Sequence, residues 1–125
     1  MAAQKTVLVV EDSEINRATL SGILSSEYRV LEAGDGREAL GLLELYGERI
    51  ALILLDIVMP VMDGYTFLSI VKAHPDYASI PVIVTTQSDS EADEVAALSH
   101  GATDFVAKPY KAQIILHRAA SIISL

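Results

Sequence analysis

Five short segments rich in apolar and β-branched residues recur along the chain and read as buried strands. They cover residues 6–10, 28–33, 50–56, 81–86 and 105–107. The third segment is apolar at every position from Ile50 to Leu55 and ends abruptly on Asp56. A run without polar alternation is typical of a strand that is covered on both faces of a parallel sheet.

Segments with apolar residues at helical spacing follow these strands. Ser13 is a suitable cap for a first helix that extends to about Ser26, and the second helix ends near Tyr46. The third helix ends at His74, because a residue before proline is pushed away from helical dihedrals. A fourth helix begins at the cap Ser90 and closes at Gly101, and a fifth carries apolar residues from position 114 to position 123.

This alternation of strand and helix indicates an α/β fold. We expect a doubly wound five-stranded parallel sheet with right-handed crossovers and helices on both faces. The chain shows no internal repeat, low-complexity stretch or linker-like segment, so residues 1–125 are expected to form a single domain.

Composition narrows the function classes. The chain has 125 residues, of which 51% are hydrophobic, so it is long enough to bury a core. It has no cysteine, which excludes disulfides, thiol catalysis and thiolate metal sites. A formal net charge of -8 argues against a direct nucleic-acid partner, which would require clustered basic residues. Residues 1–5 are too short and polar for a signal peptide, and no apolar run approaches the roughly 20 residues of a membrane span. We therefore expect a cytoplasmic protein without a membrane partner.

Polar side chains gather at the predicted carboxyl ends of the strands. Glu11 and Asp12 follow the first strand, Asp56 ends the third, Thr86 ends the fourth and Lys108 follows the fifth. In an open α/β sheet, ligands bind at this edge. The sequence therefore predicts one site that contains three acids, a hydroxyl and an ammonium.

The chemistry of this set favours a divalent cation and a phosphoryl group. Two carboxylates about 5 Å apart repel each other by roughly 3 kcal/mol at an effective dielectric constant near 20, so a cluster of three draws in a cation. Oxygen ligands without His or Cys select Mg²⁺. An ionised Asp56 is a nucleophile that needs no general base, while Lys108 and Thr86 can neutralise phosphoryl oxygens.

Taken together, these motifs resemble the receiver domain of the two-component response regulators. The resemblance rests on the acid pair Glu11-Asp12, residues 55–64 around Asp56, Thr86, and residues 105–109 around Lys108, in that order and at matching spacing. It covers essentially the whole chain. The resemblance implies a flavodoxin-like (βα)5 fold with strand order 2-1-3-4-5.

The resemblance also implies a function. Asp56 would accept a phosphoryl group from a phosphohistidine of a sensor histidine kinase or phosphotransfer protein. Mg²⁺ would be held by Asp12, Asp56 and the backbone carbonyl of Val58, and Glu11 would support it directly or through water. Thr86 would swing toward the phosphoryl group, and Phe105 would turn inward into the space that it leaves. The readout would be the face built from the fourth helix, fifth strand and fifth helix. Such a domain is a switch and not a turnover enzyme, although it promotes its own phosphorylation and dephosphorylation.

Two positions depart from the commonest pattern of that family. Gln87 stands where alanine or glycine is usual, and Val58, two residues after Asp56, is apolar. Both could restrict the attacking water. We therefore expect the phosphorylated form to lose its phosphate slowly.

Other interpretations fit less of the chain. Residues 34–39 match a G-x-G-x-x-A dinucleotide loop, but Asp35 would then face a pyrophosphate. A flavodoxin needs a hydroxyl-rich phosphate loop where Glu11 and Asp12 stand, and a phosphatase of the haloacid dehalogenase type needs a second aspartate where Val58 stands. Two further possibilities concern the output: a receiver segment that regulates a fused domain such as a diguanylate cyclase, or a docking module that is never phosphorylated.

Overall fold

The computed structural model describes residues 4–57, 61–86, 91–108 and 110–123, and within 91–108 it leaves the side chains of Glu91 and Asp93 undescribed. Strands and helices alternate along the chain, as the sequence predicts. In chain order the elements are β1 (Thr6–Val10), α1 (Glu14–Leu24), β2 (Arg29–Ala33), α2 (Gly36–Tyr46), the short 3-10 helix η1 (Gly47–Arg49), β3 (Ile50–Asp56), α3 (Gly64–Ala73), β4 (Val82–Thr86), α4 (Glu91–Ser99), β5 (Asp104–Ala107) and α5 (Ala112–Ile123).

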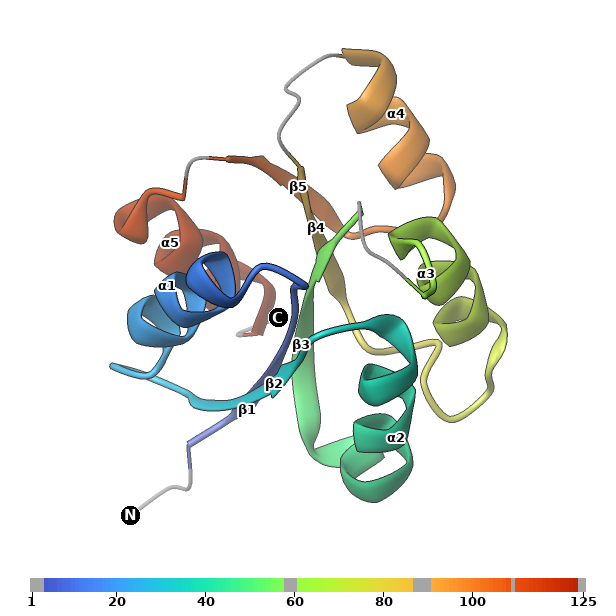
Figure 1. The fold of residues 1–125 in the computed structure, drawn as a ribbon, viewed down its shortest axis with the longest axis horizontal. Helices are drawn as coiled ribbons and strands as arrows, with labels where there is room; N and C mark the ends of the chain where they lie inside the picture. Colours follow the sequence, from blue (N-terminus) through green and yellow to red (C-terminus); the bar gives the residue numbers. More distant parts are fainter. Residues whose placement is uncertain (1–3, 58–60, 87–90, 109, 124–125) are drawn as a thin grey trace.

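The five strands form one parallel sheet with the order β2-β1-β3-β4-β5. Helices α1 and α5 cover one face, and α2, α3 and α4 cover the other (Figure 1). The predicted doubly wound α/β fold, including the strand order 2-1-3-4-5, is thereby confirmed. Among the described residues, no helix has both the length and the apolar character needed to cross a bilayer.

Alternation along the strands divides the core into two halves. In β1, Val7 and Val9 pack toward α1 and α5, whereas Leu8 and Val10 pack toward α2, α3 and α4. The central strand β3 repeats this division, so it is buried on both faces and has no polar side chain before Asp56. A strand of this kind is held rigidly from both sides, and its last residue is therefore placed with little freedom.

Side-chain caps begin three of the helices. The side chains of Ser13, Asp35 and Asp63 accept hydrogen bonds from backbone N–H groups at the starts of α1, α2 and α3, at 3.2, 2.9 and 3.0 Å. The prediction for Ser13 is confirmed, whereas the proposed cap Ser90 lies outside the described residues. Helix α3 ends before Pro75 as expected, and Gly101 has the positive φ of 102° that closes α4.

Helix α1 is shorter than the sequence predicts. It ends at Leu24, and the hydroxyls of Ser25 and Ser26 donate to the carbonyls of Gly22 and Ile23. Serine side chains that bond to nearby backbone carbonyls compete with helix continuation. The chain consequently turns directly into β2, which begins at Arg29, one residue after the predicted start.

The start of α3 lies against the end of β3. A Cβ atom on Gly64 would lie 2.6 Å from the carbonyl oxygen of Asp56 and 2.6 Å from Cα of Ile57. The Gly64 N–H also donates to the Ile57 carbonyl at 2.8 Å. Only glycine fits this approach, so Gly64 determines how closely α3 packs against the backbone that carries Asp56.

Gly64→Ala is predicted to destabilise the fold by about 1–3 kcal/mol, because the added methyl group overlaps backbone atoms that cannot move aside easily. Urea unfolding would measure the loss. Gly22→Ala and Gly41→Ala are matched controls inside helices, where a new Cβ has no neighbour within 4 Å. They should stabilise the protein by about 0.5–1 kcal/mol. Equal stability of Gly64→Ala and wild type would contradict this packing.

Candidate functional site

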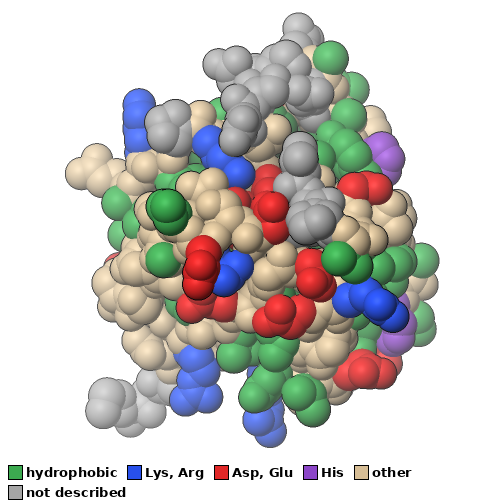
Figure 2. All heavy atoms as spheres, in the orientation of Figure 1, with side chains coloured by type: hydrophobic (Ala, Val, Ile, Leu, Met, Phe, Trp, Pro, Cys, Tyr) green, Lys and Arg blue, Asp and Glu red, His purple; other side chains and the backbone are tan. Residues whose placement is uncertain are grey.

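The carboxyl edge of the sheet brings together acids that are far apart in the sequence. Because β1 and β3 run parallel with Val10 opposite Leu55, the residues that follow β1 lie beside Asp56 at the end of β3. Carboxylate oxygens of Glu11, Asp12 and Asp56 lie within 4.8 Å of one another. Acidic side chains, with basic ones beside them, gather near the centre of the face shown in Figure 2.

These acids differ strongly in exposure. Glu11 and Asp56 are only 1% and 3% exposed, whereas Asp12 is exposed. Lys108, which follows β5, places its Nζ atom 3.3 Å from Oε1 of Glu11 and 3.3 Å from Oδ1 of Asp56. One ammonium thus contacts two carboxylates, with that of Asp12 close to both, and the cluster retains negative charge when all three acids are ionised.

Burial shapes the titration of this cluster. Burial, followed by the neighbouring charge of Glu11, raises the pKa of Asp56 to about 7, against the opposing effect of the Lys108 ammonium. Burial also opposes the charged form of Lys108, but electrostatic interactions with Tyr110, Asp56 and Glu11 outweigh it and leave the lysine pKa raised. At neutral pH the lysine is therefore charged, and Asp56 is poised between its two protonation states.

The two oxygens of Glu11 have different surroundings. Oε1 accepts from Nδ2 of Asn16 at 3.2 Å and from Nζ of Lys108 at 3.3 Å. Oε2 is buried and has no hydrogen-bond partner among the described residues. A buried carboxylate oxygen without a partner is costly unless a cation or donor occupies the space before it. Together with Asp12 and Asp56, it forms a set of hard oxygen donors that fits Mg²⁺.

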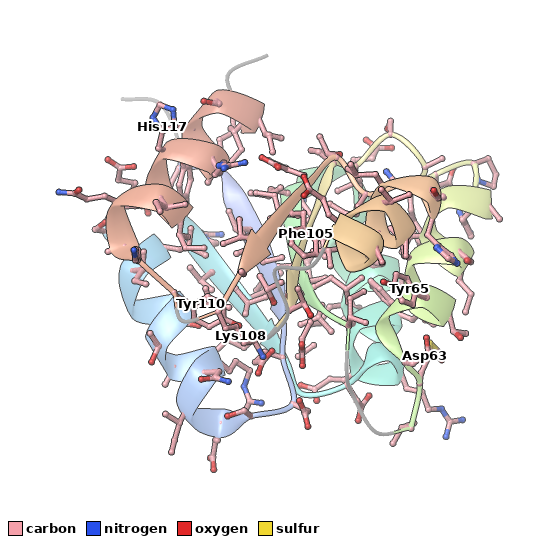
Figure 3. The ribbon with its side chains drawn as sticks, turned by 90° about the horizontal axis from the view of Figure 1, so that it is seen from above. Asp63, Tyr65, Phe105, Lys108, Tyr110 and His117 are labelled. Atoms are coloured by element: carbon pink, nitrogen blue, oxygen red, sulfur yellow. The ribbon has the colours of Figure 1, made fainter. Side chains whose placement is uncertain are left out.

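Thr86 and Phe105 lie on β4 and β5, the two strands that follow β3 in the sheet on the side away from β1. Thr86 is buried at the end of β4, one residue after the residue that pairs with Asp56 in the sheet. Its carbonyl accepts from the Lys108 N–H at 2.7 Å. The half-buried ring of Phe105 packs against the core half under α2, α3 and α4, and it lies between β5 and α4 in Figure 3.

Tyr110 lies beside the lysine. Figure 3 places the two residues close together on the α1 side of the site, and Nζ of Lys108 is 5.9 Å from the centroid of the tyrosine ring. The tyrosine hydroxyl donates to Oγ1 of Thr85 at 3.4 Å. Burial raises the pKa of Tyr110 to about 12, so the phenol is neutral at pH 7. The ring thus borders the ammonium of the site.

The predicted site residues fall into two groups. Glu11, Asp12, Asp56 and Lys108 are brought together, with Thr86 on the adjacent strand end. The Val58 carbonyl and the Gln87 side chain lie outside the described residues, so their predicted roles stay predictions.

Sequence reasoning missed two residues at the start of α1. Asn16 contacts the Glu11 side chain, and Nη1 of Arg17 donates to the Glu11 carbonyl at 2.8 Å. The sequence holds one signal for these two residues. They stand three and four positions after the cap Ser13 and therefore lie one turn along the helix. That spacing places Asn16 and Arg17 in the first turn of the helix, but it does not show that their side chains point toward Glu11.

The alternative of a dinucleotide loop has no support in the described backbone. Asp35 caps α2, and its carboxylate accepts from the Glu38 N–H at 2.9 Å. A pyrophosphate would need that helix end for itself, and the carboxylate would repel it.

The chain is similar to known proteins over most of its length. The chain is 40% identical over 116 residues to a probable cyclic di-GMP phosphodiesterase of Vibrio cholerae, a match that covers 93% of this chain and 26% of that protein. The chain therefore spans only about a quarter of the length of this relative.

Solved structures match over nearly the full chain. Chemotaxis protein CheY4 of Vibrio cholerae has a TM-score of 0.88 at 31% identity, covering 96% of this chain and 99% of that one. The receiver domain of sensor histidine kinase PA1611 of Pseudomonas aeruginosa, solved with a magnesium ion in its active site cleft, has a TM-score of 0.88 at 30% identity, covering 99% of this chain and 100% of that one. Residues 7–120 match the profile of the response regulator receiver domain. The chain belongs to the response regulator receiver domain family.

Proposed function

We propose that residues 1–125 form a single receiver domain that acts as a phosphorylation-activated signalling switch. Asp56 accepts a phosphoryl group from a phosphohistidine of a sensor histidine kinase or phosphotransfer protein, in a reaction that depends on Mg²⁺. The observation that carries the proposal is the buried Asp56 carboxylate, 3.3 Å from the Lys108 ammonium and clustered with two further acids.

The transfer step uses Asp56 as the nucleophile. A carboxylate oxygen attacks phosphorus, a P–O bond forms, and the P–N bond to the donor histidine breaks with its electron pair left on the histidine nitrogen. Lys108 stabilises the negative charge on the transferring oxygens, and the Thr86 hydroxyl donates to one of them. Glu11, Asp12, Asp56 and the Val58 carbonyl would hold Mg²⁺, whose charge offsets that of the phosphoryl group.

The signal is carried by the strands on the far side of the site. Thr86 moves toward the phosphoryl group, Phe105 turns inward, and the face formed by α4, β5 and α5 changes. Phosphoryl contacts that exist only in the active arrangement shift the population toward it by their differential energy. The backbone bond between Lys108 and Thr86 supports this route, because it joins the two strand ends directly. The domain works in the cytoplasm and is not a turnover enzyme, although it promotes its own phosphorylation and dephosphorylation.

A phosphorylated domain of this kind can pass on its signal in two ways. The domain either signals to a separate protein or regulates a fused output domain, for example a diguanylate cyclase. The Vibrio cholerae relative, named as a cyclic di-GMP phosphodiesterase and about four times as long as the matched segment, favours a link to cyclic di-GMP. A third possibility, docking without phosphorylation, would leave Asp56 unmodified.

Asp56 also links site chemistry to fold stability. Its pKa is raised from an ordinary value near 3.9 to about 7, so the folded state binds the proton more tightly than the unfolded state. The stability that this proton provides is complete below the unfolded pKa and is lost as the pH rises through 7. The protein without Mg²⁺ should therefore lose stability between pH 5 and pH 8.

The first prediction from the proposed function concerns the phosphoacceptor. Treatment with acetyl phosphate and Mg²⁺ should add one phosphate to the wild type, because Asp56 is the ionisable nucleophile beside Lys108. Intact-mass measurement gives the result directly. Asp56→Asn should remain unmodified, and Asp35→Asn, a capping aspartate outside the site, should be modified like wild type. Phosphate on the Asp56→Asn variant, or none on the wild type, would remove the assignment.

The second prediction concerns pH. Between pH 5 and pH 8, the free energy of unfolding should decrease by roughly 2–4 kcal/mol less in Asp56→Asn than in the wild type, since one pKa unit corresponds to about 1.4 kcal/mol. Denaturant unfolding at several pH values without Mg²⁺ measures this slope. Asp76→Asn, at an exposed position, serves as the control and should keep the wild-type slope. A parallel pH dependence of Asp56→Asn and wild type would show that Asp56 does not titrate near neutrality.

The third prediction concerns the lifetime of the phosphorylated form. If Gln87 shields the phosphoryl group from water, Gln87→Ala should release phosphate faster than the wild type. Loss of the added mass over time after removal of the phosphodonor measures the rate. An unchanged rate would leave Gln87 without this role.

A further inference from the structure

The start of α1 turns two side chains back toward the acidic site. Asn16 donates from Nδ2 to Oε1 of Glu11 at 3.2 Å, and its own backbone N–H is held by the Ser13 cap at 3.2 Å. The Asn16 contacts have no part in the proposed attack by Asp56 or in the charge stabilisation by Lys108. The position of Asn16 relative to the acid pair is thus fixed through both its backbone and its side chain.

Arg17 fixes the backbone of the same acid. Its Nη1 donates to the Glu11 carbonyl at 2.8 Å, while its Nε lies 3.3 Å from Oε1 of Glu32 on β2. The Glu11 N–H donates to the carbonyl of Ala33 at 3.0 Å. Both backbone polar groups of Glu11 are therefore bound, and rotation of its side chain is the freedom that remains.

Asn16 limits that rotation. It shares Oε1 of Glu11 with Lys108, so both donors hold the same oxygen, and Oε2 stays buried with no hydrogen-bond partner in the described part of the chain. If Lys108 were the only donor, the carboxylate could turn and offer both oxygens to the ammonium. That rotation would draw Lys108 away from Asp56 and leave no Glu11 oxygen free for a cation.

We propose that Asn16 is a positioning residue that presents Oε2 of Glu11 to the divalent cation. This inference rests on the metal site of the proposed function and adds to it a residue that does not itself touch the cation. Hydrogen-bond partners that orient a metal ligand are typically worth 10-fold to 100-fold in metal affinity. Asn16 supplies that orientation from the first turn of α1, a segment apart from every strand end that carries a ligand.

The test replaces Asn16 by leucine, which has a similar size, favours helix and cannot donate. Asn16→Leu should bind Mg²⁺ about 10-fold more weakly than the wild type, and unfolding in the absence of Mg²⁺ should be unchanged or improved. Mg²⁺ titration followed by the shift in thermal midpoint measures the affinity without any phosphodonor. Thr19→Ala is the matched control, because Thr19 is an exposed residue of the same helix whose hydroxyl donates to the Ile15 carbonyl.

A double-mutant cycle separates positioning from a general effect on the fold. In a Glu11→Gln background, Asn16→Leu should change Mg²⁺ affinity less than about twofold, because its effect passes through the Glu11 carboxylate. A 10-fold loss that persists in that background would overturn the proposal, as would wild-type affinity in Asn16→Leu. Should Asn16→Leu fail to fold, Asn16→Ala takes its place with the same expectations. Absence of any Mg²⁺ effect on the wild type would overturn the metal site itself, and the role of Asn16 with it.

Discussion

The whole site depends on one unbalanced electrostatic contact. Nζ of Lys108 lies 3.3 Å from each of two almost fully buried carboxylates, and carboxylate oxygens of these two acids and of Asp12 lie within 4.8 Å of one another. A single ammonium does not neutralise three carboxylates in a space from which water is largely excluded. The fold therefore maintains a local excess of negative charge, which favours binding of a divalent cation. Burial, together with the charge of Glu11, holds the pKa of Asp56 near 7.

The sheet tolerates this strain because its strands are held from both sides. Apolar side chains of β1 and β3 pack alternately into the two core halves, so the backbone leading to Glu11 and Asp56 has no freedom to separate the acids. Contacts from outside the strands complete the arrangement: Asn16 and Arg17 hold Glu11, and Tyr110 borders Lys108. The core thus provides the free energy that keeps like charges close together.

The architecture and the cluster of acids could be predicted from the sequence because both follow from a simple pattern. Apolar runs that end on Asp56, Lys108 and the acid pair place these residues at one edge once the strands are parallel. The role of Asn16 could not be predicted in this way, because a hydrogen bond between side chains depends on rotamers and on the exact angle of α1. The exact end of α1 also differs from the prediction. The hydroxyls of Ser25 and Ser26 compete with helical backbone hydrogen bonds, and local geometry decides whether they do so.

The close packing at Gly64, the first residue of α3, makes the two sides of the site unequal in rigidity. Because Gly64 lies against the carbonyl of Asp56, α3 and the end of β3 form one unit that cannot be pushed apart or together without overlap or loss of a hydrogen bond. On the opposite side, β3 pairs with β4, and β4 in turn pairs with β5. In the proposed switch, rearrangements that begin at Asp56 therefore run toward β4 and β5, and helix α3 is the side of the site that stays fixed.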